Sequence, residues 1–302
     1  MPCFHPLNAF QSSAIRSANG KREISFQPPK YAAVPIELPC GQCIGCRLER
    51  SRQWAIRCVH EASLHKENCF ITLTYNDLHA PPDGSLRVRD FQLFMKRLRK
   101  KHGAGIRFFH CGEYGENFGR PHYHACIFGF DFADKKHWST RNGLPLYRSA
   151  DLEQLWPFGF SSIGTVTFES AAYVARYIMK KINGDAALDH YTQIDYSTGE
   201  IHHLKPEYTT MSRRPGIAAD WLKKFTSDVY NHDFIVLNQK KLRPPRYYDA
   251  QYELVSPDHL KQIKLKRKTD AKKHLDNNTP SRLSVREQVT QARLTKLPRK
   301  LK

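Results

Sequence analysis

The chain has 302 residues, 40% of them hydrophobic, which is enough to bury one sizeable core and to leave room for a small module and a tail. Its 48 Lys and Arg against 29 Asp and Glu give a formal net charge of +19, which favours a polyanionic partner, nucleic acid first. No run of about 18 apolar residues is present to span a bilayer, and the opening MPCFHPLNAF lacks the features of a secretory signal. We therefore expect the eight cysteines to be reduced, as metal ligands or buried thiols.

The first zone, residues 1–66, is expected to form a cysteine-rich module followed by a helix over 47–65. Three of its thiols fall within seven residues: Cys40, Cys43 and Cys46. A closed structural zinc site needs four ligands, and Cys3 is the best fourth, with His5 as its substitute. An iron–sulfur site is the alternative metal centre. The simpler alternative is a set of reduced, buried thiols that bind no metal. The remaining cysteines are expected in the core: Cys58, Cys69, Cys111 and Cys126.

The second zone, residues 67–235, alternates strand-like and helix-like stretches. Runs of β-branched and aromatic residues predict strands over 69–75, 105–114, 122–130 and 161–168. Apolar residues at helical spacing predict helices over 90–100 and 170–182. The segment GENFGR between the middle strands supplies turn residues for a hairpin, so at least part of the sheet is antiparallel. We therefore predict an α+β domain with helices on one face of the sheet.

The third zone, residues 236–302, is rich in Lys and Arg and poor in aromatic residues. This composition predicts a solvated or weakly helical basic tail.

A pair of histidines in the predicted strand 122–130 is the sharpest local motif. Residues two apart in a strand project from the same face, so His122 and His124 point together, and Tyr123 packs on the opposite face. The predicted hairpin brings Glu113 back towards them, and Glu116 in the turn is its substitute. Two imidazoles and a carboxylate make an open site for Mg²⁺ or Mn²⁺, with positions left for phosphate oxygens. Two ordinary sheet histidines are the alternative.

The predicted helix 170–182 carries two tyrosines one turn apart. Thr167 or Ser170 caps its start, and Gly184 fits its end. On a helical wheel the apolar residues form one stripe, and the opposite side carries Tyr173, Tyr177 and Lys180. The tyrosines therefore lie away from the expected core face, where a phenol oxygen can attack a DNA phosphate and Lys180 can stabilise a phenolate or contact the phosphate. A second packing surface is the alternative for this side.

Three segments in this order resemble a known family. The segments CFITLTY, GEYGENFGRPHYHACIFG and YVARYIMKK resemble the replication initiators of the small single-stranded DNA bacteriophages of the Microviridae, with the motifs of HUH endonucleases. The segments PCGQCIGCR and MPCFHP look like the gokushovirus branch, and the similarity covers roughly residues 1–220.

The resemblance implies a five-stranded antiparallel sheet with flanking helices and a metal site, together with the small cysteine module. It also implies that the protein nicks the replication origin, keeps a covalent 5′-phosphotyrosine while a free 3′-hydroxyl primes rolling-circle replication, and then rejoins the strand. On this pattern His122 and His124 are metal ligands, Tyr173 and Tyr177 are nucleophiles, and Lys180 is the lysine that follows the tyrosine pair. The third ligand varies in the family, so its assignment here rests on spacing.

The expected partners are origin DNA and host replication proteins, without a membrane. Because the chain has no G-x-x-x-x-G-K-[ST] loop, a host helicase is expected to unwind DNA and a host polymerase to copy it, in the cytoplasm of the bacterial host. Arg120, Arg213 and Arg214 are candidates for gripping DNA backbone phosphate, with a solvated charged face as the alternative. The rival functions are a transposase or relaxase with the same chemistry, and a non-catalytic zinc-containing nucleic-acid-binding protein.

Overall fold

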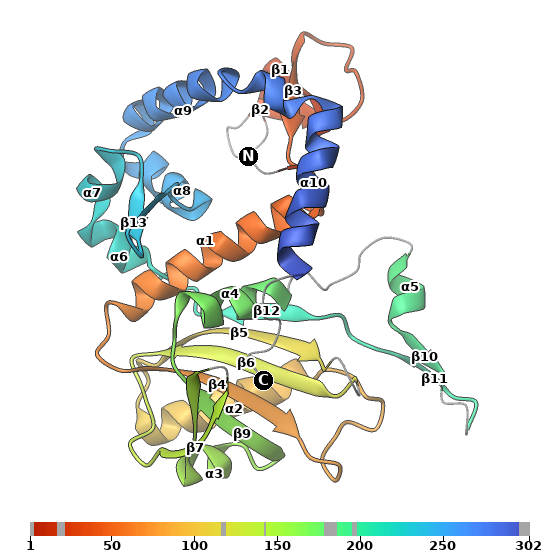
Figure 1. The fold of residues 1–302 in the computed structure, drawn as a ribbon, viewed down its shortest axis with the longest axis vertical. Helices are drawn as coiled ribbons and strands as arrows, with labels where there is room; N and C mark the ends of the chain where they lie inside the picture. Colours follow the sequence, from red (N-terminus) through yellow and green to blue (C-terminus); the bar gives the residue numbers. More distant parts are fainter. Residues whose placement is uncertain are drawn as a thin grey trace. The chain divides into compact units, whose positions relative to one another are not determined.

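The computed structural model describes residues 3–16, 22–115, 119–141, 143–177, 186–194 and 198–295 (Figure 1). By their contacts, the described residues up to Arg50 and from Lys264 onward form a first compact unit, and Ser51–Ile263 form a second. Helices α1 (Ile44–Ala62) and α9 (Pro257–Lys272) continue from one unit into the other. The three zones expected from composition remain a prediction. No helix of these residues combines the length and the apolar composition needed to cross a membrane.

The second unit is built on a seven-stranded antiparallel sheet with the order β12-β5-β6-β4-β9-β8-β7. Its strands are β4 (Asn68–Tyr75), β5 (Arg107–Tyr114), β6 (Pro121–Phe128), β7 (Lys136–Arg141), β8 (Leu144–Arg148), β9 (Gly159–Gly164) and β12 (Tyr208–Met211). The α+β class and the antiparallel hairpin are confirmed, but the expected number of about five strands is too low. The sequence missed β7, β8 and β12, because β7 is exposed along almost its whole length and β8 and β12 have only 5 and 4 residues.

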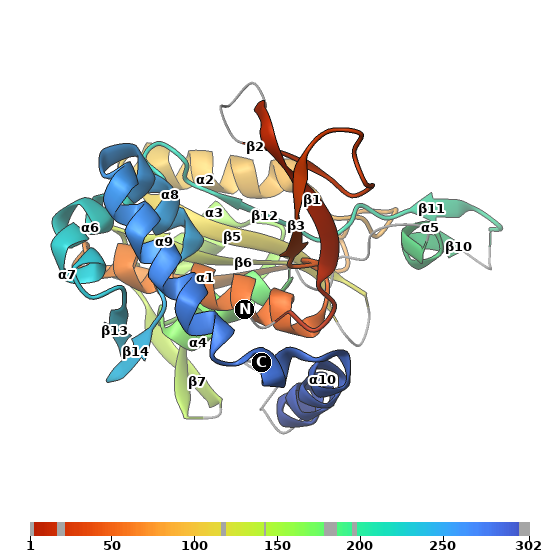
Figure 2. The same ribbon diagram turned by 90° about the horizontal axis from the view of Figure 1, so that it is seen from above.

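Helices cover both faces of this sheet, which corrects the expectation of a single covered face (Figure 2). Helices α2 (Val88–His102) and α3 (Ala150–Leu155) pack on one face, where Phe91 and Tyr123 are fully buried. Helices α1 and α4 (Phe168–Tyr177) pack on the other, where Trp54 stacks on Phe109 with ring centroids 4.6 Å apart. The physical reason is that β6 is buried on both sides, as Ala125 and Cys126 show, so neither face of the sheet can be left in water.

A helical layer beyond α1 completes the core of the second unit. Helices α6 (Ala219–Lys224), α7 (Thr226–Tyr230), α8 (Arg246–Val255) and the start of α9 bury apolar side chains with Ile56 of α1. The stretch expected to be a solvated or weakly helical tail is therefore helical, and Tyr248 and Leu260 in it are fully buried. The remaining elements of this unit are α5 (Ala186–His190) and the hairpins β10 (Thr192–Ile194) with β11 (Ile201–His203) and β13 (Ile235–Leu237) with β14 (Lys240–Leu242).

The first unit joins the two ends of the chain. It contains the three-stranded sheet β2-β1-β3, a 3-10 turn and a C-terminal helix: β1 (Leu7–Arg16), β2 (Arg22–Ser25), β3 (Ala33–Leu38), η1 (Leu275–Asn278) and α10 (Pro280–Thr295). Its buried cluster is small and centres on Cys3, Phe4, Cys43 and Leu283, so α10 packs directly on the cysteine segment. The small sheet is an element that the sequence analysis missed.

Candidate functional site

The two histidines of β6 lie on one face of the sheet, as the strand period predicts. The ring centroids of His122 and His124 are 6.4 Å apart, and Tyr123 between them points into the core under α2. In the β5–β6 hairpin, Glu113 stands directly opposite His122. Opposed residues of an antiparallel pair share a face, so the hairpin brings the carboxylate to the histidines. Glu116, the substitute, lies outside the described residues.

His124 is fixed through both ring nitrogens. Its Nε2 lies 2.7 Å from Glu113 Oε1, and its Nδ1 lies 3.0 Å from Thr72 Oγ1 of the neighbouring strand β4. His124 and Glu113 are 3% and 1% exposed, so the pair is held in a water-poor environment, where an electrostatic contact is strong. Thr72 was missed by the sequence analysis, because only the β4–β6 register places it beside His124.

Helix α4 begins with a reciprocal cap that fixes its direction. The Thr167 hydroxyl accepts a hydrogen bond from the Ser170 backbone N–H at 3.1 Å, and Ser170 Oγ accepts one from the Thr167 N–H at 2.8 Å. Of the two expected capping residues, Thr167 takes the N-cap and Ser170 the third helical position. Gly184, the expected end of the helix, lies outside the described residues.

Tyr173 lies beside the histidines, although it is not on an open side of the helix. It is 8% exposed and belongs to the same buried cluster as Val174, which corrects the expectation that it lies away from the core face. The reason is that α4 is enclosed on two sides, by the sheet and by α1, whose Ser51 donates a hydrogen bond to the Ala172 carbonyl. The Tyr173 ring is nearly perpendicular to that of His124, with centroids 5.1 Å apart.

The structure describes only part of Tyr177 and nothing of Lys180, the two residues expected to act with Tyr173. The backbone of Tyr177 ends α4, but its side chain lies outside what the structure describes. Lys180 lies entirely outside the described residues.

A cavity of about 290 Å³ opens from this site towards the edge of the sheet. His122, His124 and Tyr173 line one part of it. The rest is lined by β4, β9 and the β7–β8 hairpin, including Trp138 and Phe160. No motif in the sequence predicts that the β7–β8 hairpin contributes to this site.

The expected DNA-contacting arginines differ in what surrounds them. Arg213 and Arg214 are exposed in the turn between β12 and α6. Arg120 is instead engaged within the protein: one guanidinium nitrogen donates to the Tyr75 carbonyl at 3.0 Å, and another pairs with the Asp77 carboxylate. In the described structure Arg120 therefore ties the β5–β6 turn to the end of β4.

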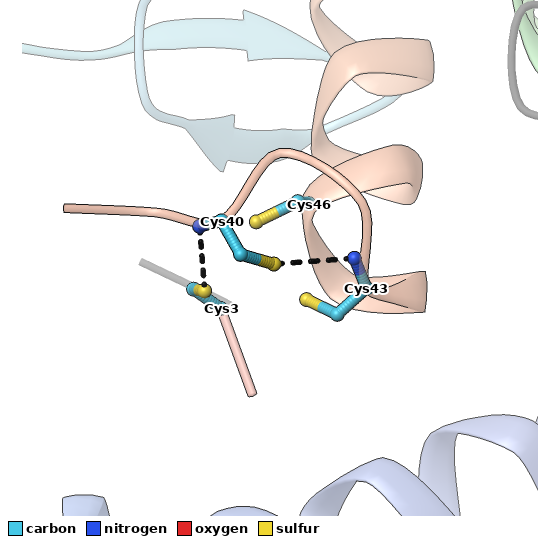
Figure 3. A group of neighbouring side chains, drawn as sticks. All are labelled: Cys3, Cys40, Cys43 and Cys46. Atoms are coloured by element: carbon cyan, nitrogen blue, oxygen red, sulfur yellow. Dashed lines mark hydrogen bonds between the residues drawn. The ribbon is translucent and has the colours of Figure 1, made fainter. Parts of the chain in front are cut away.

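The four expected cysteines converge in the first unit. The sulfurs of Cys3, Cys40, Cys43 and Cys46 all lie within 4.8 Å of one another and face a common centre (Figure 3). Among the described residues, these four cysteines are the group whose possible ligand atoms are close enough together to hold one metal ion. The side chains of His122, His124 and Glu113 do not all come within this distance of one another. His5, the substitute ligand, is instead 2.7 Å from Glu287 of α10. The other four cysteines are fully buried in the second unit, as expected.

Backbone amides point at the cysteine sulfurs. The N–H groups of Phe4, Cys40 and Cys43 donate to Cys43, Cys3 and Cys40 Sγ respectively, each at 3.3 Å. Burial raises the pKa of the Cys43 thiol, but hydrogen bonds from the Phe4 and Cys46 backbone and from neighbouring thiols outweigh it and lower the pKa to about 7. Since the thiolate is the form that binds a metal, the donors around Cys43 favour its ligating state. Burial instead raises the pKa values of the Cys3 and Cys46 thiols.

Comparison with known proteins identifies the kind of protein to which these sites belong. The family model described as replication-associated protein ORF2/G2P matches residues 68–182, a stretch that includes the β5–β6 hairpin and α4. The chain is 33% identical over 282 residues to replication-associated protein VP4 of Bdellovibrio phage phiMH2K, covering 90% of this chain and 84% of that protein. It is 30% identical over 296 residues to replication-associated protein ORF2 of Spiroplasma virus 4, covering 91% and 88%.

A third relative is matched over part of its length. Replication-associated protein ORF4 of Chlamydia phage 1 is 32% identical over 231 residues, covering 73% of this chain and 55% of that protein. No solved structure matches the chain.

Proposed function

The chain belongs to the family of replication-associated proteins of small single-stranded DNA bacteriophages, and from that premise we propose that it initiates replication by nicking origin DNA with a tyrosine. The observation that carries the proposal is the contact of Tyr173 with His124, whose Nε2 lies 2.7 Å from the buried Glu113 carboxylate. The cavity is lined by one phenol and two imidazoles, and the His124 imidazole contacts the buried Glu113 carboxylate behind it. These are the groups that metal-dependent phosphodiester transesterification by a tyrosine uses.

We propose that His122, His124 and Glu113 hold Mg²⁺ or Mn²⁺. The fit rests on the donor set: Thr72 engages Nδ1 of His124, so Nε2 is directed at Glu113, and His122 stands opposite Glu113 in the register. Nitrogen and carboxylate donors suit Mn²⁺, and three protein ligands leave positions for substrate oxygens. When bound, such an ion polarises phosphoryl oxygens and offsets the negative charge of the transition state.

In the proposed reaction the Tyr173 oxygen attacks the phosphorus of the scissile phosphodiester. The bond from phosphorus to the tyrosine oxygen forms, and the bond from phosphorus to O3′ breaks. The phenol gives up its proton and the departing oxygen gains one, so the products are a 5′-phosphotyrosine and a free 3′-hydroxyl. The reverse reaction rejoins the strand. Tyr177, one turn further along α4, is the proposed second nucleophile, and Lys180 is proposed to contact the phosphate or the phenolate.

Contacts to the DNA backbone are proposed for the exposed Arg213 and Arg214. For Arg120 we propose that its DNA contact requires it to leave Asp77, which is 87% exposed and therefore holds it weakly. Host helicase and polymerase remain the proposed partners, and the host cytoplasm the proposed location.

For the cysteine cluster we propose a structural zinc ion. Four sulfur ligands with N–H donors around them match closed tetrahedral sites, and a closed site leaves no position for a substrate. An iron–sulfur centre uses the same ligands, and metal content measured by mass spectrometry distinguishes the two.

The proposed function is tested by covalent capture. The full chain is incubated with a labelled single-stranded oligonucleotide from its viral origin, with Mn²⁺ or without added metal, and resolved on a denaturing gel. We expect a metal-dependent adduct that is lost when Tyr173→Phe and Tyr177→Phe are combined, while the single variants rank the two nucleophiles. Tyr252→Phe, a tyrosine of α8, is the matched control and keeps the adduct.

Binding without an adduct in any of these reactions would overturn the nicking proposal and favour the zinc-containing DNA-binding protein. A transposase or relaxase would form the same adduct, so the origin sequence that supports cleavage separates that role from replication initiation.

A further inference from the structure

Two large aromatic side chains are exposed beside the histidine–tyrosine site. Trp138 of β7 is 51% exposed and Phe160 of β9 is 63% exposed. Both line the cavity that also contains His122, His124 and Tyr173. A single exposed aromatic residue is ordinary, but two in one cavity, next to candidate reactive groups, indicate a surface for a flat ligand.

The strand register places Phe160 in line with the candidate site. Glu113 stands opposite His122, His122 opposite Thr74, and Thr74 opposite Phe160, so these four residues form one row across β5, β6, β4 and β9. Members of such a row share a face of the sheet. Two strand spacings separate Phe160 from His122, a distance of about 10 Å. This places the exposed ring within one or two nucleotides of a phosphate held at the histidines.

Trp138 is directed by an irregularity of its strand. His137 is paired with Tyr147 and Ser139 with Leu146, so Trp138 is the extra residue of a β-bulge. Bulges at sheet edges re-aim a side chain, and β7 is the edge strand of the seven-stranded sheet. The Arg141 guanidinium lies 5.8 Å from the Trp138 ring centroid and also lines the cavity.

We propose that Trp138 and Phe160 form a stacking subsite for unpaired bases of single-stranded DNA next to the scissile phosphodiester. Exposed aromatic rings beside a cationic side chain are the combination that binds single strands, because every base offers a flat face to the rings while the cation attracts the backbone. The subsite therefore accepts any base and selects single-stranded over paired DNA. The inference rests on the proposed function for the identity of the ligand.

The test separates base stacking from backbone contact. Full-length protein carrying Tyr173→Phe and Tyr177→Phe, which cannot form a phosphotyrosine, is titrated against two labelled probes by fluorescence anisotropy. One probe is an oligothymidylate of about twelve nucleotides, within the usual site size of single-strand binders, and the other is the same backbone without bases. We expect Phe160→Leu and Trp138→Leu each to weaken oligothymidylate binding by about 5- to 100-fold and to leave binding of the base-free strand unchanged.

Conservative and matched variants complete the test. Phe160→Trp and Trp138→Phe keep a ring and are expected to retain the affinity. Phe26→Leu, which removes a ring that is also 63% exposed but lies in the first unit, is expected to change nothing. Unchanged binding in both leucine variants, or equal weakening on both probes at an unchanged melting temperature, overturns the subsite. If the subsite stands while the wild-type chain forms no adduct on origin DNA, the nicking proposal fails alone.

Discussion

The cysteine cluster and the histidine site take their ligands from the chain in different ways. Three of the four cysteines come from one seven-residue segment, Cys40–Cys46, at the start of α1. His124, Glu113 and Thr72 come from three separate strands, and Tyr173 comes from the helix α4 further along the chain. The cysteine cluster is therefore a local loop completed by one residue that is distant in sequence, Cys3. The histidine site, in contrast, forms only once the strands of the sheet have paired.

The surroundings of the two sites differ in the same sense. The cysteines belong to a buried cluster with few other members, in the smaller of the two units, so little apolar burial holds the loop in place. His124 lies over a large core and is already hydrogen-bonded to Thr72 and Glu113. We infer that a metal stabilises the fold at the cysteines, whereas at the histidines the hydrogen bonds of the sheet hold His124 and Glu113 in place without one.

The largest expected effect is the loss of metal from the cysteine cluster. A structural zinc ion contributes about 10 kcal/mol or more of apparent binding free energy, which the small cluster cannot replace. Cys43→Ser is expected to lose the zinc and to release α10, so that trypsin cleaves at Arg286 and Arg293, while the second unit keeps its thermal transition. Cys58→Ala, which removes a buried thiol of the second unit, keeps the zinc. If Cys43→Ser still binds one zinc ion per chain, Cys43 is not a required ligand and the inferred difference between the two sites is wrong.

Removal of a histidine is expected to act on the reaction and leave the zinc bound. His124→Gln should slow adduct formation on the order of 10³-fold, because it removes a ligand of the metal ion that is proposed to stabilise the transition state. Electron paramagnetic resonance of bound Mn²⁺ measures the same loss without catalysis. His232→Gln, at an exposed histidine of the second unit, provides the control. Normal Mn²⁺ affinity in His124→Gln would remove His124 from the ligand set.

Acid is expected to destabilise the second unit through a buried histidine. Burial lowers the pKa of His60 from 6.5 to about 4, where it is stacked on Trp221 and lies 2.8 Å from the Tyr248 hydroxyl. The unfolded chain binds the proton more readily, so stability is complete above pH 6.5 and falls as the pH is lowered towards 4, by about 3 kcal/mol. Urea unfolding of the wild type and His60→Gln at several pH values measures the difference. If the free energy of unfolding changes equally with pH in both proteins, the acid sensitivity comes from groups other than His60.

The smallest expected effect concerns the residue that orients His124. Thr72→Val keeps the shape of the side chain and removes the hydroxyl that contacts Nδ1, so Mn²⁺ affinity and adduct formation should both fall about 10-fold. Thr72→Ser restores the hydroxyl and is expected to restore both. A loss of adduct without a loss of Mn²⁺ affinity would show that Thr72 acts on the DNA rather than on the histidine.

Much of the second unit could be predicted from local sequence. Residue periodicity and capping chemistry depend only on neighbours in the chain. They predicted the strands β4, β5, β6 and β9, the helix α2 and the cap of α4. The pairing of Glu113 with the histidines was also predictable, because a hairpin turn fixes the register of its two strands. The same reasoning failed for β7, β8 and β12, which are short or exposed strands without a clear sequence pattern.

By itself, therefore, the sequence determined the cysteine spacing, the histidine pair, the tyrosine helix and the net charge. Only the tertiary structure decided that both faces of the sheet are covered, that Tyr173 is buried against His124, and that Thr72 orients that ring. It also decided that Trp138 and Phe160 share a cavity with them. These neighbours are set by register across strands and by how helices enclose α4, and a linear pattern of residues carries neither.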